Sequence, residues 1–157
     1  MMTMKKTLVL SLLAGGLAAC SAPGHYVPGK STMTEVRAGA GTPTDIRFAA
    51  NGDELWEYAK GPSGTETYLL RFGRDGQVKA VTQLLTEEQF GKIVPGQTTK
   101  DAARDLLGQP SNTAFMNGGA AWSWHVRVQG REGQFVVSFG PDGIARDKKL
   151  NLAGGQP

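Results

Sequence analysis

The sequence is poor in the residues that bind metals and form covalent cross-links. Among its 157 residues there is one cysteine, so no disulfide can form within the chain, and the two histidines, His25 and His125, are far apart. Metal sites and nucleophilic sites need such residues at defined spacings, and no Cys-x-x-Cys, His-x-x-x-His or Gly-x-Ser-x-Gly pattern occurs. We therefore expect no catalytic site, no metal site and no cofactor.

Net charge is also small. The chain has 17 basic and 14 acidic residues, a formal charge of +3. Lys5 and Lys6 lie in a segment that we expect to be removed, which leaves 15 basic residues against 14, or +1. A charge this small and this scattered does not form a phosphate-binding stripe, so nucleic acid is not an expected partner.

The N-terminus has the pattern of a lipoprotein signal peptide. Lys5 and Lys6 precede an apolar stretch over residues 7–19, which is too short to span a membrane comfortably. It ends in Leu-Ala-Ala-Cys at residues 17–20, which resembles the bacterial lipobox, where the cysteine thiol is alkylated with diacylglycerol and the peptidase cuts before it. The pattern predicts a signal peptide over residues 1–19 and lipidation at Cys20. Three acyl chains at this position exceed what stable anchoring needs.

The residues after Cys20 indicate where the anchor lies. Ser21 follows it, whereas aspartate at that position is what the lipobox resemblance associates with retention in the inner membrane. We therefore expect an outer-membrane lipoprotein that faces the periplasm. Residues 20–30 are predicted to form the lipidated linker, and the ten residues from 21 to 30 reach at most about 35 Å when extended.

The chain matches itself at an offset of 67 residues. The aligned segments are 27–44 with 94–111, 51–58 with 117–124 at an offset of 66, and 68–78 with 135–145. A one-residue insertion in a loop explains the slip in the middle. The sequence therefore predicts two copies of one supersecondary unit, the first over residues 31–83 and the second over residues 84–150.

Each unit is predicted to contain a short helix followed by antiparallel strands. In the second unit Thr98 offers a cap for the helix start, and Gly108 fits the left-handed position just past the helix end. The first unit repeats this pattern from Thr32 to Gly41. A further amphipathic helix is expected in the second unit over the segment 84–93.

The segment 120–128 alternates between apolar and polar residues, as a strand with one buried face does. Its apolar side carries Trp122, Trp124, Val126 and Val128. Its polar side carries Ser123, His125 and Arg127. We predict that the apolar side lies in the core and that the polar side is a candidate partner-binding face.

Two pentapeptides, FGRDG at residues 72–76 and FGPDG at residues 139–143, fall at equivalent places in the repeat. A calcium loop needs more oxygen ligands at alternating positions than either of them offers. Glycine adopts positive φ without strain, and aspartate can hydrogen-bond the turn backbone. Both pentapeptides therefore predict hairpin turns.

The second unit resembles the SmpA/OmlA family of outer-membrane lipoproteins, to which the barrel-assembly factor BamE belongs. The shared pattern is a helix, Gly-x-Thr at residues 96–98, a helix closing with Leu-Gly-x-Pro at residues 107–110, an aromatic strand, and a strand ending in Phe and a turn. The first unit shows only the later part, because its leading helix is missing. Two such units in tandem are also similar to the β-lactamase inhibitor protein architecture.

The resemblance implies an α+β fold of two tandem BamE-like units, each with short helices packed on an antiparallel sheet. We expect the helices to cover one face of each sheet, the other face to be left polar for a partner, and inward-facing Trp and Phe residues to hold the units together.

Family members are not enzymes. The resemblance therefore implies a scaffold or accessory factor in β-barrel protein assembly or envelope integrity. Its partners would be the outer membrane, through the N-terminal lipid, and a periplasmic protein, with the barrel-assembly machinery among the candidates. One alternative is a periplasmic inhibitor or sensor that captures an enzyme, as the tandem inhibitor fold does. Another is a small-molecule or lipid carrier, which needs an apolar cavity.

The predicted anchor can be tested with Cys20→Ser, which removes the thiol that would carry the lipid. We expect the variant to leave the membrane fraction and to lose metabolic labelling with palmitate. A variant that still sediments with outer membranes and still takes up label would show that the lipobox interpretation is wrong.

Overall fold

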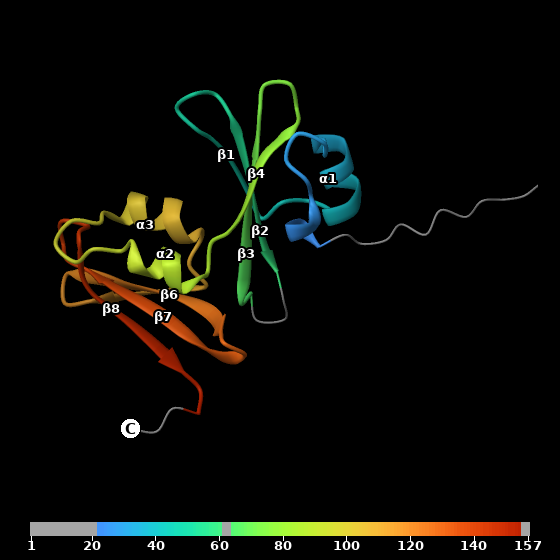
Figure 1. The fold of residues 1–157 in the computed structure, drawn as a ribbon. Coiled ribbons are helices and arrows are strands. Elements are labelled where there is room, and N and C mark those ends of the chain that lie inside the picture. The colour runs from blue at the N-terminus through green and yellow to red at the C-terminus, as the bar shows by residue number, and fades with distance from the viewer. Residues whose placement is uncertain (1–21, 61–63, 155–157) are drawn as a thin grey trace, which may run out of the picture.

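The computed structural model describes residues 22–60 and 64–154 (Figure 1). The predicted signal peptide over residues 1–19 and the predicted lipidation site, Cys20, lie outside the described residues, as do residues 61–63 of the segment GPSGT. The described chain forms two units in succession, each with a four-stranded antiparallel sheet and short helices. The predicted α+β fold of two similar units is therefore confirmed.

The elements follow the same order in both units, except that the second begins with an additional α-helix. The first unit contains η1 (Pro23–His25), α1 (Met33–Ala40), β1 (Asp45–Phe48), β2 (Glu54–Lys60), β3 (Glu66–Phe72) and β4 (Val78–Gln83). The second contains α2 (Glu87–Gly91), α3 (Lys100–Leu107), β5 (Asn112–Met116), β6 (Gly119–Val128), β7 (Arg131–Phe139) and β8 (Ala145–Leu152). In each sheet the strands pair in sequence order, so each is a simple meander.

The registers of the two sheets match, as expected of a duplicated unit. Asp45 lies opposite Glu57 in the first sheet, and Asn112 lies opposite Ser123 in the second. These are the residues that offsets of 67 and 66 connect, so the one-residue slip falls in the turn between the first two strands of each sheet.

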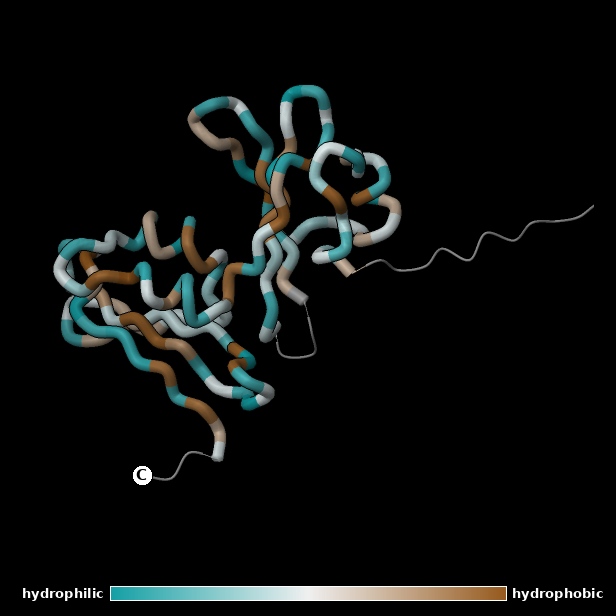
Figure 2. The backbone as a smooth tube through the Cα atoms, in the orientation of Figure 1, coloured by the Kyte–Doolittle hydropathy of each residue, from teal (hydrophilic) through white to brown (hydrophobic). Residues whose placement is uncertain are grey.

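Each unit has its own hydrophobic core, and hydrophobic residues are interspersed along the strands of both sheets (Figure 2). An aromatic residue at the same place in each core also binds the end of the unit's helix. Tyr58 Oη donates to the carbonyl oxygen of Gly41 at 3.1 Å, and Trp124 Nε1 donates to that of Gly108 at 3.1 Å. Burial of the ring thus satisfies a carbonyl that the helix itself leaves without a partner.

The helix ends differ from the sequence prediction in two details. The cap of α3 is Thr99, whose Oγ1 accepts from the backbone N–H of Ala102 at 3.1 Å, whereas Thr98 Oγ1 accepts from the N–H of Val94 at 2.8 Å. The predicted cap was therefore one residue too early. Gly108 has positive φ as expected, but its φ of 76° and ψ of −168° place it in a region that is essentially restricted to glycine, not in the left-handed helical region.

The two predicted hairpin turns are confirmed. They join β3 to β4 and β7 to β8, and Gly76 and Gly143 both have a φ of 75°. Asp75 Oδ1 and Asp142 Oδ1 each accept a hydrogen bond from the backbone N–H two residues further on, at 3.1 Å. Both aspartates therefore hold the turn backbone, as the sequence predicts.

The described part of the predicted linker, residues 22–30, is folded onto the first unit. Pro23 is buried in η1, and Tyr26 Oη donates to the carbonyl oxygen of Val36 at 3.5 Å. The N–H of Gly29 donates to the carbonyl oxygen of Val78, the first residue of β4, at 2.8 Å. Most of this segment is packed against the first unit, so it does not extend to the upper limit of about 35 Å.

A buried carboxylate joins the two units. Glu57, on the face of the first sheet away from α1, is 1% exposed. Its Oε1 accepts from the backbone N–H of Gln109 at 2.8 Å, and its Oε2 accepts from Arg47 at 3.0 Å. Arg104 of α3 donates to Asp45 at 2.8 Å across the same contact. The end of α3 is thereby held against the back of the first sheet. We call this contact the joint.

Two expectations about the units are corrected by the joint. The Trp and Phe residues do not hold the units together, because Trp56 and Trp124 belong to separate cores. The face of the first sheet away from α1 is not left free for a partner either, since the end of α3 contacts it through Glu57 and Arg47. Charged and hydrogen-bonding groups, rather than aromatic rings, position one unit on the other.

Gly108→Ala and Gly41→Ala form a matched test of the joint. Both glycines have positive φ, 76° and 80°, but a Cβ at Gly108 would lie 2.7 Å from Glu57 Oε1, whereas a Cβ at Gly41 would meet nothing within 4 Å. We expect Gly41→Ala to lower the free energy of unfolding by about 1–3 kcal/mol through backbone strain. Gly108→Ala should cost about 1–3 kcal/mol more, because the methyl group overpacks the joint. Equal losses in urea melts of the two variants would show that the joint is loose.

Alkaline pH gives a second test, at Tyr58. Burial raises its pKa to about 12 from a usual value near 10, and the Arg37 guanidinium opposes this shift. Between these values the unfolded chain has lost the phenolic proton while the folded chain keeps it, so stability falls as the pH rises. We expect the free energy of unfolding of Tyr58→Phe to decline less steeply than that of the wild type across this window. Parallel declines in urea melts would contradict the assignment.

Candidate functional site

In the described part of the chain, no helix covers one of the two faces of the second sheet. Both α2 and α3 lie on the side of its buried aromatic residues (Figure 1). The alternation predicted for β6 is observed, because Trp124, Val126 and Val128 are buried, although Trp122 is only half-buried. The residues that point the other way are half-buried or exposed, and we call them the open face: Ala121, Ser123, His125, Arg127, Glu132, Gln134, Val136, Ser138, Asp147, Lys149 and Asn151.

All three predicted contact residues lie on this open face, but they differ in how exposed their side chains are. Ser123 and His125 are half-buried, and Arg127 is exposed. The backbone N–H of His125 donates to Ser111 Oγ at 3.1 Å, which holds the segment after α3 beside β6. Arg127 forms an ion pair with Glu132 on β7, and this hydrogen bond raises the pKa of the guanidinium above its usual value. Arg127 is therefore a permanent positive charge at the rim of the face.

A shallow pocket of about 310 Å³ lies on the open face next to the first unit. It is lined by Thr65, His125, Glu132, Gly133, Gln134 and Ala153. Thr65 immediately precedes β3 of the first unit, so the pocket is lined by residues of both units. The joint holds the two units together, so this end of the open face is formed by residues of both units.

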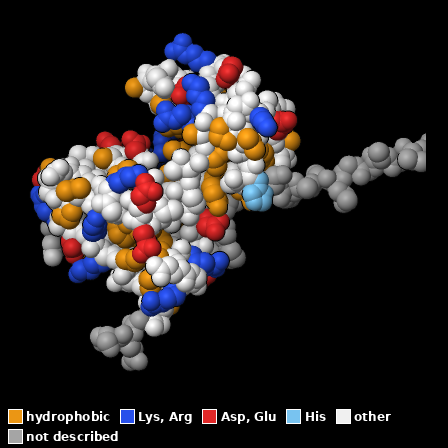
Figure 3. All heavy atoms as spheres, in the orientation of Figure 1, with side chains coloured by type: hydrophobic (Ala, Val, Ile, Leu, Met, Phe, Trp, Pro, Cys, Tyr) orange, Lys and Arg blue, Asp and Glu red, His pale blue; other side chains and the backbone are white. Residues whose placement is uncertain are grey.

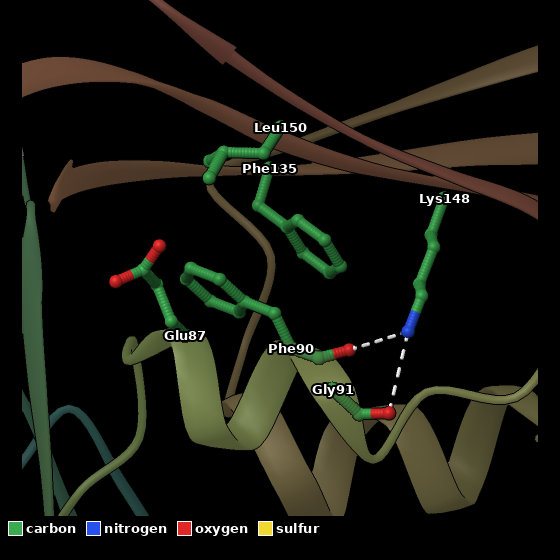
Figure 4. A pocket seen from close by; sticks show the side chains of 6 residues that line it. All are labelled: Glu87, Phe90, Gly91, Phe135, Lys148 and Leu150. Atoms are coloured by element: carbon green, nitrogen blue, oxygen red, sulfur yellow. Dashed lines mark hydrogen bonds between the residues drawn. The ribbon is translucent and has the colours of Figure 1, made fainter.

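A second pocket, of about 250 Å³, lies between α2 and β8 (Figure 4). The rings of Phe90 and Phe135 stack in it with centroids 4.3 Å apart, and Leu150 adds to its apolar wall. Lys148 Nζ donates to the carbonyl oxygens of Phe90 at 3.0 Å and Gly91 at 3.3 Å. The lysine thus caps the end of α2, which gives it a structural role beside an apolar hollow.

The described residues contain no group of three or more metal-ligating side chains. Within the same part of the chain, no helix is long and apolar enough to cross a membrane. On the face of the molecule in Figure 3, acidic and basic side chains are interspersed. The open face carries hydroxyl, amide and charged side chains, such as Ser123, Gln134 and Lys149, which can form hydrogen bonds and ion pairs with a partner.

The sequence prediction missed an exposed apolar site on β5. Phe115 is 93% exposed and Met116 is 58% exposed. At the equivalent place in the first unit, Phe48 on β1 is 71% exposed. The repeat contains the signal that could have found them, because an offset of 67 puts one phenylalanine on the other, just before the turn into the central strands.

No protein-family model and no curated protein matches the chain. One similar solved structure is YjgB, a DUF4309 family protein of Bacillus subtilis subsp. subtilis str. 168, with 18% identity, 82% of each chain covered and a TM-score of 0.31. Another, from Streptococcus mutans, is provisionally described as a beta-lactamase inhibitor protein, with 12% identity, 85% of this chain and 89% of that chain covered, and a TM-score of 0.35. The comparisons therefore do not support the resemblance to the SmpA/OmlA family that the sequence suggested. At these sequence identities and TM-scores, the function of neither protein can be assigned to this chain.

Proposed function

We propose that the chain is a lipid-anchored, non-enzymatic accessory protein of the outer membrane, which supports envelope integrity or β-barrel assembly by binding a periplasmic protein. The observation that carries the proposal is the open face of the second sheet. It combines hydroxyl, amide and charged groups on three adjacent strands, and none of the helices in residues 22–60 and 64–154 lies over them. A sheet face of this kind can bind another protein through hydrogen bonds and charge pairs.

The packing of residues 22–30 supports a contact close to the membrane. If Cys20 carries the lipid, the folded body begins at Pro23, three residues later, because η1 is already packed on the first unit. The first unit is then held at the membrane surface, and the joint fixes the second unit relative to it. The partners within reach are the periplasmic parts of outer-membrane proteins, and the barrel-assembly machinery is one of them.

The hairpin of β5 and β6 favours a second candidate, a periplasmic inhibitor. Phe115 and Met116 are exposed beside the tight turn at Asn117 and Gly118, so the hairpin ends in an apolar tip. An exposed aromatic side chain beside a tight turn can insert into the cleft of an enzyme. The inhibitor would use this tip, whereas the scaffold would use the open face.

Arg127→Glu tests the proposed binding face. We expect crosslinking of the full-length chain to its envelope partner in membranes to fall several-fold, because reversing a charge at an interface costs on the order of 1 kcal/mol or more. Stability should change little, since the ion pair with Glu132 is exposed. Lys92→Glu is the matched control, because Lys92 is also 47% exposed and ion-paired, but lies at the end of α2 on the other side of the sheet.

Equal crosslinking of the Arg127→Glu and Lys92→Glu variants would contradict a role for the open face.

A deletion strain should become modestly more permeable to large antibiotics and detergents. A strain with a normal barrier and normal barrel-protein levels, together with tight inhibition of a periplasmic enzyme by the purified protein, would favour the inhibitor.

A further inference from the structure

The strands at the edges of the two sheets are protected in different ways. At the start of β4, the N–H of Val78 donates to the carbonyl oxygen of Ser31 at 2.8 Å, and at the start of β8 the N–H of Ala145 donates to that of Thr98 at 2.8 Å. The chain before each helix therefore covers part of these edges. Strand β1 carries two charges, Asp45 and Arg47, which are used in the joint.

Strand β5 has none of these protections from the residues that the structure describes. All five of its residues, Asn112–Met116, are exposed, and it ends the second sheet, with β6 as its only neighbour among the described strands. It lies in a run over residues 106–126 that contains no Asp, Glu, Lys or Arg, although one residue in five of the chain is charged. An uncharged edge strand with unpaired backbone groups is a template for pairing with another strand.

The hairpin turn determines which backbone groups of β5 face outward. Met116 lies opposite Gly119, and the two residues between them, Asn117 and Gly118, have φ values of 44° and 80°. A two-residue turn of this type makes its flanking residues a hydrogen-bonded pair, and the direction of the bonds alternates along the strand. The N–H and carbonyl groups of Thr113 and Phe115 therefore point away from β6, toward the free edge.

We propose that β5 pairs in antiparallel fashion with β5 of a second copy of this chain, about a twofold axis at Ala114. In this register Thr113 of each copy lies opposite Phe115 of the other, so the outward backbone groups of both residues find partners. An aromatic residue opposite a β-branched residue is a favourable cross-strand pair. The two sheets then join into one, and the open faces of both copies lie on the same side.

The absence of charge on β5 is the reason to choose a second copy as the occupant. A twofold axis brings each residue near its own counterpart, so any charge on the strand would be repelled by the same charge on the other copy. The remaining edge strands carry charges, for example Lys148 and Lys149 on β8, and would meet this repulsion. The pairing also closes on itself, because each copy offers a single β5 edge.

Ala114→Cys tests the axis directly in the full-length chain in its native membranes. In the proposed register the two Ala114 residues form a non-hydrogen-bonded pair, whose Cα atoms lie about 4.5 Å apart, within the range that a disulfide spans. We expect most of this variant to run as a disulfide-linked dimer after mild oxidation. Lys149→Cys, on the opposite edge of the sheet, and the wild type, which has only Cys20, are the controls.

A charge-swap experiment tests whether the pairing is between copies. Two differently tagged copies of the full-length chain are expressed together, and their co-purification is measured. Ala114→Lys in both copies should weaken self-association about tenfold or more, because like charges then lie opposite each other. Ala114→Lys in one copy with Ala114→Glu in the other should restore it. Since Ala114 is exposed in the single chain, both variants should still fold.

Several results would overturn the proposal. One is no disulfide in Ala114→Cys beyond that of the Lys149→Cys control. Another is undiminished co-purification of two Ala114→Lys copies, which would place the contact between copies elsewhere. Loss of co-purification in both the Lys–Lys and the Lys–Glu combinations would show that the contact does not have Ala114 on its axis.

Discussion

The relative position of the two units depends on one buried carboxylate. Glu57 is almost fully removed from water, and a buried charge is stable only when its hydrogen bonds are satisfied by the protein. One of its oxygens is bound by Arg47 of the same sheet, and the other by the backbone N–H of Gln109, which follows α3. Separating the units would leave half of this carboxylate without a partner. The position of the open face beside Thr65 therefore follows from a polar contact.

Gly108 shows how the helix end and the joint constrain each other. Its conformation is restricted to glycine, its carbonyl oxygen accepts from Trp124 in the core of the second unit, and its Cα faces Glu57 of the first. One residue thus ends a helix, contacts the core of its own unit and allows close approach of the neighbouring sheet. A side chain here would disturb all three at once, because there is no free space in which to place it.

The local structure could be predicted from the sequence, but the contact between the two units could not. The period-2 pattern around Trp124 and the Asp-Gly turns depend on neighbouring residues, so they could be read directly. The cap at Thr99 was predictable in principle, since the repeat aligns it with Thr32. The joint could not be read, because Arg104 and Asp45 are distant in sequence and ordinary in composition. Nor does a single strand show whether its polar side faces solvent, as in β6, or a second unit, as in β2.

The joint has a consequence for how many units can stack. It is a head-to-tail contact, in which the helix end of one unit binds the back of the preceding sheet, and such contacts continue into open chains unless something stops them. The residues of the first sheet that receive α3 are Asp45, Arg47 and Glu57, and the repeat places Asn112, Ala114 and Ser123 at the same positions of the second sheet. All three charges are gone, so the second unit cannot accept a further unit in the same way. The second sheet therefore lacks the charged groups that hold the end of α3 on the first sheet.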